Sequence, residues 1–253
     1  MLRTIRHGEI HELRLDRPPV NALDSQTIAT LRAAVEGAPG EGAQALVLSG
    51  APGIFSAGLD VPRLLALDRA GIRAAWGDFY RLMGALAASP VPVAAAITGH
   101  SPAGGAVLAI FCDHRVMAEG EFRIGLNEVQ VGIAMPPAIH AALARLVGAR
   151  QADRLCIGGL MIDPEEALRV GLIDELVPPE QVVEIALHWC RTLLALPRQA
   201  MLETRRTARA PLAALLAGQD EHVEVDLMVD RWFSAETQAT LRAVVERLKS
   251  KRG

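Results

Sequence analysis

The sequence predicts an α/β protein with a helical C-terminal region. Short apolar runs with the length of buried strands alternate with stretches in which apolar residues recur at helical spacing. From Pro179 onward the pattern is helical and shows no strand-like alternation. We therefore expect a core over residues 1–195 and a helical region over residues 196–253. The strand-like runs are Ile10–Leu15, Ala45–Leu48 and Val91–Ile97.

Capping and turn residues mark the ends of several predicted elements. The strand over 10–15 alternates apolar and polar residues and stops at the two prolines after Arg17. Either Asp24 or Ser25 caps the first helix. Asp163 precedes a proline and two glutamates, which is typical of a helix start. A short strand is expected at 172–177.

A long helical pattern over 62–89 has a stripe of large apolar side chains along one face. Trp76, Phe79, Met83 and Leu86 recur at the spacing of neighbouring helical turns. Such a stripe usually faces a hydrophobic core. We interpret it as a core face and not as a cofactor site.

Charge and cysteine content exclude several classes of function. The formal net charge is −3 and no long basic run is present, which argues against nucleic acid or an anionic membrane as the main partner. The odd number of cysteines, Cys112, Cys156 and Cys190, predicts neither a disulfide framework nor a metal cluster. The first residues lack the apolar segment of a secretory signal, and no apolar run is long enough to span a membrane. We expect a cytoplasmic protein.

Two loops rich in small residues follow predicted strands. They are residues 55–60 (FSAGLD) and 99–105 (GHSPAGG). Small residues let a ligand approach the backbone, and a helix that begins after such a loop leaves N–H groups free to bind it. Two loops of this kind can supply the two donors of an oxyanion hole. Glycine-rich turns are common in α/β proteins, however, and most of them only reverse the chain direction.

The second loop also resembles the GxSxG nucleophile elbow of serine hydrolases. Gly99, Ser101 and Ala103 occupy its first, third and fifth positions. The fifth position is alanine where tight packing requires glycine. Pro102 follows the serine and has no N–H to contribute to an oxyanion hole. These two features argue against a serine hydrolase.

Several motifs together resemble the crotonase superfamily, and they do so in order along nearly the whole chain. Residues 101–105 together with 124–128 are also similar to the mitochondrial-type Δ3,Δ2-enoyl-CoA isomerases. This resemblance implies a crotonase-type spiral of ββα units, with C-terminal helices that form a homotrimer or a dimer of trimers. The motifs are Arg17–Leu23, Phe55–Asp60, Pro102–Gly105 and Cys112–Asp113.

The resemblance also implies a binding site for an acyl-CoA thioester. It assigns the backbone N–H groups of Leu59 and Gly104 to the oxyanion hole. Backbone groups of Ala22 and Ala57 are expected to bind the coenzyme A portion. Coenzyme A is then part of the substrate, and neither a separate cofactor nor a metal is expected.

The catalytic assignment depends on counting carboxylates. Hydratases of the family use two glutamates, whereas Val107 takes the first of those positions here and Glu128 takes the second. One carboxylate is suited to a 1,3-proton shift. The resemblance therefore favours a 3-enoyl-CoA isomerase with Glu128 as the catalytic acid–base. Val107, Leu126 and Met135 are expected to line the acyl pocket beneath a helix over 62–89.

Other functions remain open on the sequence alone. The superfamily uses one oxyanion hole for several reactions, so a hydratase, a thioester hydrolase or a decarboxylase of acyl-CoA is an alternative. A non-catalytic acyl-CoA-binding scaffold is another. The presence of Glu128 beside an intact oxyanion hole argues against the scaffold.

Overall fold

The main sheet has six strands, and only the pair of strands at one edge is antiparallel. A computed structural model describes residues 2–217 and 220–250. The strand order is β1-β2-β3-β5-β7-β9, with β1 antiparallel to β2 and every other neighbouring pair parallel. The strands are β1 (Leu2–His7), β2 (Ile10–Leu15), β3 (Ala45–Ser49), β5 (Val93–Ile97), β7 (His114–Ala118) and β9 (Glu175–Val177).

A second, smaller sheet holds three short parallel strands in the order β4-β6-β8. The chain passes from the large sheet to the small one three times, from β3 to β4, from β5 to β6 and from β7 to β8. Helical segments follow each pair. This repetition confirms the expected spiral of ββα units. The short strands are β4 (Gly53–Ile54), β6 (Gly99–Pro102) and β8 (Ile124–Gly125).

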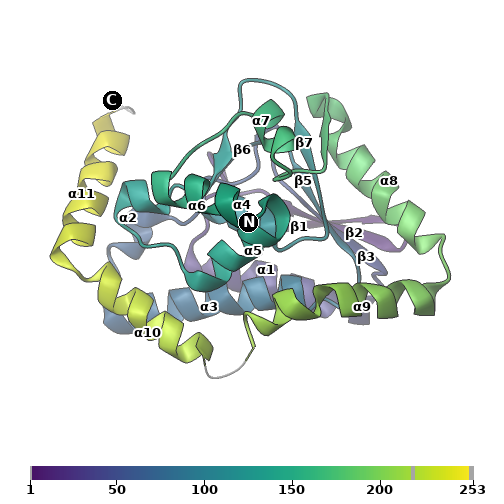
Figure 1. Ribbon diagram of the computed structural model, residues 1–253, viewed down its shortest axis with the longest axis horizontal. Helices are drawn as coiled ribbons and strands as arrows, with labels where there is room; N and C mark the ends of the chain where they lie inside the picture. Colours follow the sequence, from purple (N-terminus) through teal and green to yellow (C-terminus); the bar gives the residue numbers. More distant parts are fainter. Residues whose placement is uncertain (1, 218–219, 251–253) are drawn as a thin grey trace.

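Helices cover both faces of the large sheet (Figure 1). The α-helices of the core are α1 (Ser25–Gly37), α2 (Val61–Leu64), α3 (Arg69–Ala87), α4 (Gly104–Ile110), α5 (Pro137–Val147), α6 (Ala149–Gly158), α7 (Pro164–Arg169) and α8 (Val182–Leu194). Three 3-10 helices are η1 (Ala38–Glu41), η2 (Glu128–Val131) and η3 (Pro179–Gln181). The last helices are α9 (Arg198–Ala214), α10 (Asp220–Trp232) and α11 (Ala235–Ser250).

The strands of the large sheet contribute to two separate hydrophobic clusters. In β3, Leu46 and Leu48 belong to the larger cluster, and Val47 belongs to the smaller one. Successive side chains of a strand point to opposite faces, which explains this division. Helix α8 covers the smaller cluster and runs along the sheet at the right of Figure 1. The central strand β5, which is buried on both faces, is apolar throughout.

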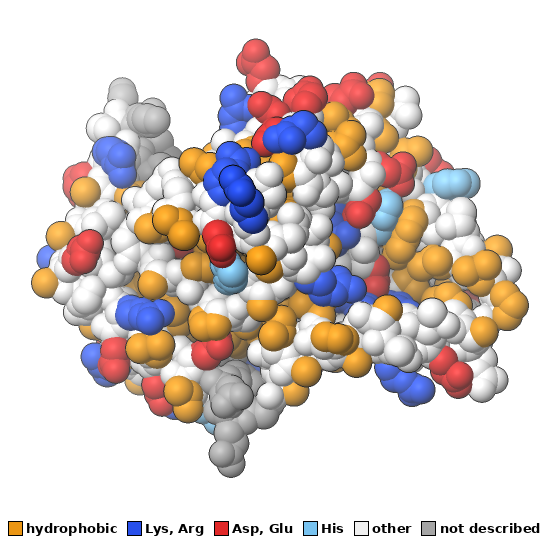
Figure 2. All heavy atoms as spheres, in the orientation of Figure 1, with side chains coloured by type: hydrophobic (Ala, Val, Ile, Leu, Met, Phe, Trp, Pro, Cys, Tyr) orange, Lys and Arg blue, Asp and Glu red, His pale blue; other side chains and the backbone are white. Residues whose placement is uncertain are grey.

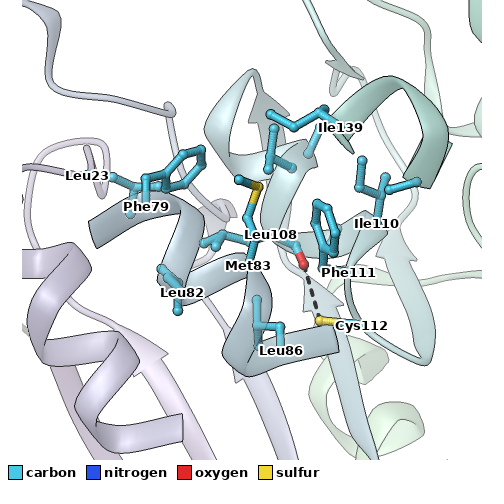
Figure 3. Close-up of a cluster of buried hydrophobic side chains, with 14 of the residues drawn as sticks. Leu23, Phe79, Leu82, Met83, Leu86, Leu108, Ile110, Phe111, Cys112 and Ile139 are labelled. Atoms are coloured by element: carbon cyan, nitrogen blue, oxygen red, sulfur yellow. Dashed lines mark hydrogen bonds between the residues drawn. The ribbon is translucent and has the colours of Figure 1, made fainter. Parts of the chain in front are cut away.

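The larger cluster fills the space between the large sheet, α1, α3 and α4. Figure 3 shows part of it, where Met83 and Leu86 of α3 pack in one group with Leu108 and Phe111. The Cys112 thiol donates to the carbonyl of Leu108 at 3.3 Å. The predicted apolar stripe of the helix over 62–89 is therefore a core face.

The C-terminal helices pack back onto the core. Helices α9 and α10 both contact α3, and α11 contacts α2 and η2. Asp113, just before β7, accepts hydrogen bonds from Arg205 of α9 and from the backbone N–H of Val93. Arg209, also of α9, is 4% exposed and pairs with the same carboxylate at 3.0 Å. The helical region thus shares buried polar contacts with the core, and its role in oligomerisation stays a prediction.

Several predicted element boundaries are confirmed, and others are corrected. The strand over 10–15 matches β2, and Asp24 caps α1 by accepting from the N–H of Thr27 at 2.8 Å. Asp163 caps α7. The helix expected over 62–89 is interrupted, because Asp68 caps a new helix start after α2 has ended. The last predicted strand is shorter and covers only 175–177.

An apolar groove of about 430 Å³ lies between α8 and α9. Figure 2 shows hydrophobic side chains gathered over α8 and its junction with α9. The groove is lined by Asp113, Trp189, Leu193, Leu196, Pro197, Ala200, Met201, Thr204, Arg205 and Ala208.

Replacing Arg209 with alanine is expected to lower the free energy of unfolding by about 1–3 kcal/mol, the cost of leaving buried hydrogen-bond acceptors without a partner, because Arg205 still pairs with Asp113. The guanidinium donates to the carbonyls of Leu86, Ala87 and Phe111, at the C-terminal ends of α3 and α4. Such carbonyls have no partner within their own helix. Denaturant unfolding measures the effect. The matched control is Arg206→Ala, on an exposed position of the same helix. Equal, small losses for both variants would contradict this role.

Candidate functional site

One large cavity, of about 650 Å³, lies where the small sheet meets the helices. Its walls are mostly apolar, which is typical of small-molecule sites. The described residues that line it come from the 17–22 segment, the loops after β4, β6 and β8, and helices α2, α3, α5 and α11. They are Arg17, Pro18, Pro19, Val20, Ala22, Ala57, Leu59, Asp60, Val61, Pro62, Arg63, Trp76, Phe79, Pro102, Ala103, Gly104, Asn127, Glu128, Val131, Ile133, Pro136, Ile139 and Val244.

The three strands of the small sheet each end at this cavity. Leu59 follows β4, Gly104 follows β6, and Glu128 follows β8. Because the strands are parallel, their carboxyl ends meet at the same edge of the sheet. Residues 45 and 24 positions apart along the chain are thereby brought to one site. The oxyanion-hole residues and the carboxylate predicted from the sequence lie in one cavity.

The backbones of the first two loops approach each other closely. A methyl group on Gly104 would lie 3.4 Å from the nitrogen of Leu59, and one on Gly58 would lie 2.9 Å from the nitrogen of Gly104. Gly58 also has a φ of +80°, which favours glycine. Among the backbone hydrogen bonds described for turns and loops, neither Leu59 N–H nor Gly104 N–H is a donor. Both N–H groups are therefore free to bind a ligand oxygen.

Ala103, immediately before Gly104, has a strained backbone. Its φ of 46° and ψ of −119° lie in a backbone region that residues other than glycine rarely adopt. The Ala103 N–H donates to the carbonyl of Gly125 at 2.8 Å, so the strained residue is attached to β8. This conformation turns the chain from β6 into the first residue of α4. Strain of this kind is concentrated at functional sites.

The 17–23 segment is attached to the first loop along its length. The N–H of Leu23 donates to the Gly58 carbonyl at 2.8 Å, and the N–H of Ala57 donates to the Val20 carbonyl at 2.9 Å. The Ala22 carbonyl accepts from Arg17 at 2.9 Å. Among the backbone hydrogen bonds described for turns and loops, none involves the Ala22 N–H or the Ala57 carbonyl. Both residues line the cavity. These groups are candidates for the expected contacts to coenzyme A.

Four charged side chains form a balanced cluster at one end of the cavity. Arg17 pairs with Asp60 at 2.8 Å and with Asp24 at 3.1 Å. Arg63 pairs with Asp24 at 2.8 Å. Asp60 also caps α2, accepting from the N–H of Arg63. Asp60 therefore has a structural role, although it lines the cavity.

Glu128 differs from the other carboxylate of the cavity because no cation of the described residues pairs with it. It is 7% exposed, and its Oε2 has no hydrogen-bond partner among the described residues. Burial raises the pKa of Glu128 to about 7, and a backbone hydrogen bond only partly opposes this shift. A carboxyl group with a pKa near neutrality exchanges protons readily at physiological pH. Glu128 has the electrostatic environment of a general acid–base.

The structure places the three expected acyl-pocket residues outside the cavity lining. Val107 lies one turn after Gly104 in α4 and is fully buried in the hydrophobic core. Leu126 lines a separate void of about 10 Å³. Met135 is half-buried and packs against the core, while its neighbours Ile133 and Pro136 line the cavity. Leu126 precedes Asn127 and Glu128, and the chain direction changes there so that only the latter two line the cavity.

Other lining residues were not predicted from the sequence. Trp76 and Phe79 belong to the apolar stripe of α3 that was interpreted as a core face, and they line the cavity as well. Their signal was present as an i, i+3 aromatic pair, but such a pair is equally typical of a core. Arg17 and Arg63 were missed because their partners, Asp60 and Asp24, are distant in sequence.

The nucleophile-elbow alternative lacks geometric support. Ser101 is fully buried, and its hydroxyl has no hydrogen-bond partner among the described side chains. Ser101 does not line the cavity, although Pro102 and Ala103 after it do. A nucleophilic serine requires a base within hydrogen-bond reach. The described part of the chain provides none for Ser101.

In residues 2–217 and 220–250 no group of three or more His, Cys, Asp and Glu side chains is arranged to hold a metal ion. No helix in the same ranges is both long enough and apolar enough to cross a lipid bilayer.

Comparison with known proteins finds relatives along nearly the whole chain. The family described as enoyl-CoA hydratase/isomerase matches residues 6–252. Human enoyl-CoA delta isomerase 1, mitochondrial, is 33% identical over 244 residues, which cover 95% of this chain and 80% of the human protein. A probable enoyl-CoA hydratase, echA17 of Mycobacterium avium, is 37% identical over 226 residues, covering 87% of this chain and 88% of its own.

The fold is also similar to solved structures. The crystal structure of human mitochondrial Δ3-Δ2-enoyl-CoA isomerase superimposes with a TM-score of 0.94 and 32% sequence identity, covering 100% of this chain and 99% of the human one. An enoyl-CoA hydratase from Mycobacterium ulcerans, EchA3, superimposes with a TM-score of 0.82 and 28% identity, covering 91% and 99%. Proteins named as isomerases and as hydratases thus share this architecture.

The raised pKa of Glu128 predicts that stability falls as pH rises. Above about pH 4.5 the carboxyl ionises in the unfolded chain, but in the folded protein it stays protonated up to about pH 7. Glu128→Gln removes this effect. The variant should gain roughly 2–4 kcal/mol of unfolding free energy relative to wild type between pH 4.5 and pH 8. Denaturant unfolding at both pH values tests this. Exposed Glu121→Gln is the control, and identical pH profiles for wild type and Glu128→Gln would contradict the shift.

Proposed function

Because the chain belongs to the enoyl-CoA hydratase/isomerase family, which is the crotonase superfamily, we propose that it isomerises 3-enoyl-CoA to trans-2-enoyl-CoA. Members of this family act on acyl-CoA thioesters. The proposal concerns the reaction that this chain catalyses within the family. Both isomerases and hydratases are among its relatives, so identity alone does not separate the two reactions.

One observation supports isomerisation above the alternatives. The cavity lining that the structure describes holds two carboxylates, and Asp60 is bound by Arg17 and used as a helix cap. Glu128 is the carboxylate left for chemistry. The position at which family hydratases carry another glutamate holds Val107, which is fully buried. A single acid–base beside two free backbone N–H groups is suited to a proton shift.

In the proposed mechanism Glu128 first acts as a base. Its carboxylate removes a proton from C2 of the 3-enoyl thioester, and the electron pair moves onto the thioester oxygen to form a dienolate. The N–H groups of Leu59 and Gly104 donate to that oxygen as its negative charge develops. The protonated Glu128 then returns the proton to C4, and the double bond comes to lie between C2 and C3.

The environment of Glu128 fits both steps. A pKa of about 7 means that the carboxylate is available as a base and that its conjugate acid is a good proton donor at neutral pH. The apolar walls exclude water, which strengthens the hydrogen bonds to the oxyanion. Loss of one such donor typically costs about 2.7–4 kcal/mol of transition-state stabilisation.

The partners follow from the same proposal. The substrate is an acyl-CoA, with coenzyme A carried as part of it and no separate cofactor. A homotrimer or a dimer of trimers in the cytoplasm is proposed, and the apolar groove between α8 and α9 is a surface in the region where subunit contacts are expected. Sedimentation velocity measures the oligomeric state.

Glu128→Gln is expected to lower the isomerisation rate at least about a hundredfold, the lower end for general acid–base catalysis. The amide keeps the shape of the side chain but cannot remove a proton. Conjugation of 3-hexenoyl-CoA followed by absorbance measures the rate, and the wild-type rate should rise with pH through a midpoint near 7. Ser101→Ala is the control and should retain nearly full activity. If Glu128→Gln kept more than a tenth of the wild-type rate, Glu128 would not be the base.

The ratio of hydration to isomerisation separates the isomerase from the hydratase. Wild-type protein should add water to 2-hexenoyl-CoA far more slowly than it isomerises 3-hexenoyl-CoA, since no second free carboxylate lines the described cavity to orient the water. Mass spectrometry distinguishes the products, because hydration adds the mass of water and isomerisation adds none. Hydrolysis would release free coenzyme A. A ratio near or above one would require the isomerase assignment to be abandoned.

A further inference from the structure

One wall of the substrate cavity separates it from a second, smaller space. The small void has a volume of about 10 Å³, and its lining is entirely hydrophobic. Three residues line both spaces, namely Leu59, Trp76 and Phe79. These residues therefore form the partition between the cavity and the void. The void is otherwise lined by Ile28, Leu64, Ile72 and Ala75.

Two aromatic rings form most of the partition and support each other. Trp76 and Phe79 project from one face of α3, one turn apart, and are 4% and 2% exposed. Their ring centroids lie 6.2 Å apart in an edge-to-face arrangement with an interplanar angle of 69°. This geometry is favourable for aromatic pairs. Figure 3 shows Phe79 on α3 together with the buried residues of that helix, which hold it in place.

The position of the partition relates it to one part of the substrate. Leu59 contributes its backbone N–H to the proposed oxyanion hole and its side chain to the partition. A thioester held by the Leu59 N–H would therefore have its carbonyl carbon close to this wall. The first few carbons of its acyl chain, where the double bond moves in the proposed reaction, would then lie beside Trp76 and Phe79. The wall limits the width of the site at these carbons.

We propose that Trp76 and Phe79 are specificity-determining residues that exclude acyl groups branched near the thioester. The aromatic partition keeps the site narrow beside Leu59, and the small void lies directly behind the rings. Shortening either ring joins the void to the cavity and adds the volume that the ring occupied. The inference rests on the proposed acyl-CoA site, but it does not depend on which reaction is catalysed there.

Binding of saturated acyl-CoA thioesters tests the proposal without turnover. The ligands are hexanoyl-CoA and its 2-methyl and 4-methyl derivatives, with dissociation constants measured by isothermal titration calorimetry. Wild-type protein should prefer the linear chain. One methyl group in a hydrophobic pocket is worth roughly 10- to 200-fold in discrimination. Phe79→Ala and Trp76→Leu should therefore reduce the preference for the linear ligand by at least about tenfold.

Two further variants separate this role from general loosening of the core. Ile72→Ala enlarges the void but leaves the partition intact, because Ile72 lines only the void. For Ile72→Ala, the ratio of the dissociation constant of the branched ligand to that of hexanoyl-CoA should equal the wild-type ratio. Phe79→Leu is a milder change that serves if Phe79→Ala does not fold, and circular dichroism establishes folding. It should shift the ratio in the same direction.

The outcomes are distinct. If a folded Phe79 variant binds hexanoyl-CoA but keeps the wild-type ratio within about twofold, the partition does not determine specificity. The same conclusion follows if Ile72→Ala changes the ratio as much as Phe79→Ala does. Absence of isomerisation by the wild-type protein would refute the proposed function alone, since the binding ratios would still test the partition.

Discussion

The close parallel packing of the three short strands β4, β6 and β8 is the constraint on which the site depends. A side chain at Gly99 would lie 2.1 Å from the backbone of Gly53, so the first two strands meet at a distance that only glycine permits. Gly125 of β8 is similarly enclosed by the carbonyl of Leu160. This packing aligns the ends of the strands. The two backbone donors and Glu128 are brought together because each follows one of these strands.

The same residues serve both as hydrophobic core and as walls of the site. Helix α3 packs Met83 and Leu86 into the core and, one to two turns earlier, presents Trp76 and Phe79 to the cavity. Burial in these apolar surroundings makes ionisation of Glu128 unfavourable and raises its pKa to about 7. The protein thus carries a group that reduces its stability at neutral pH, and this is the property that a general acid–base requires. Stability and the proposed catalytic role are in conflict at this position.

Much of the fold could be predicted from local signals. The starts of two helices were correctly predicted from the capping residues Asp24 and Asp163, and the strand over 10–15 from its alternation of apolar and polar residues. Each of these signals depends only on a few neighbouring residues. The oxyanion-hole residues and Glu128 were assigned through motifs that cover nearly the whole chain. The acyl-pocket residues could not be predicted correctly, because the side of α4 on which Val107 lies is set by packing against elements distant in sequence.

Long-range pairs were also beyond the reach of sequence patterns. Arg17 and Asp60 are 43 positions apart and meet only because the 17–23 segment lies along the first loop. The division of α2 from α3 depends on Asp68, whose capping role was hidden within a pattern that looked continuous. In each case the missing information was which segments lie side by side.

The proposed use of backbone N–H groups as oxyanion donors has a consequence for genetic variation at this site. The proposed donor at Leu59 is a backbone N–H, which every amino acid except proline carries, so substitutions of the Leu59 side chain leave that donor in place. Substitutions should instead be poorly tolerated at Gly58, where a methyl group would come within 2.9 Å of the nitrogen of Gly104. A map of mutational sensitivity would therefore show larger effects of substitution at the glycines around the proposed oxyanion hole than at position 59.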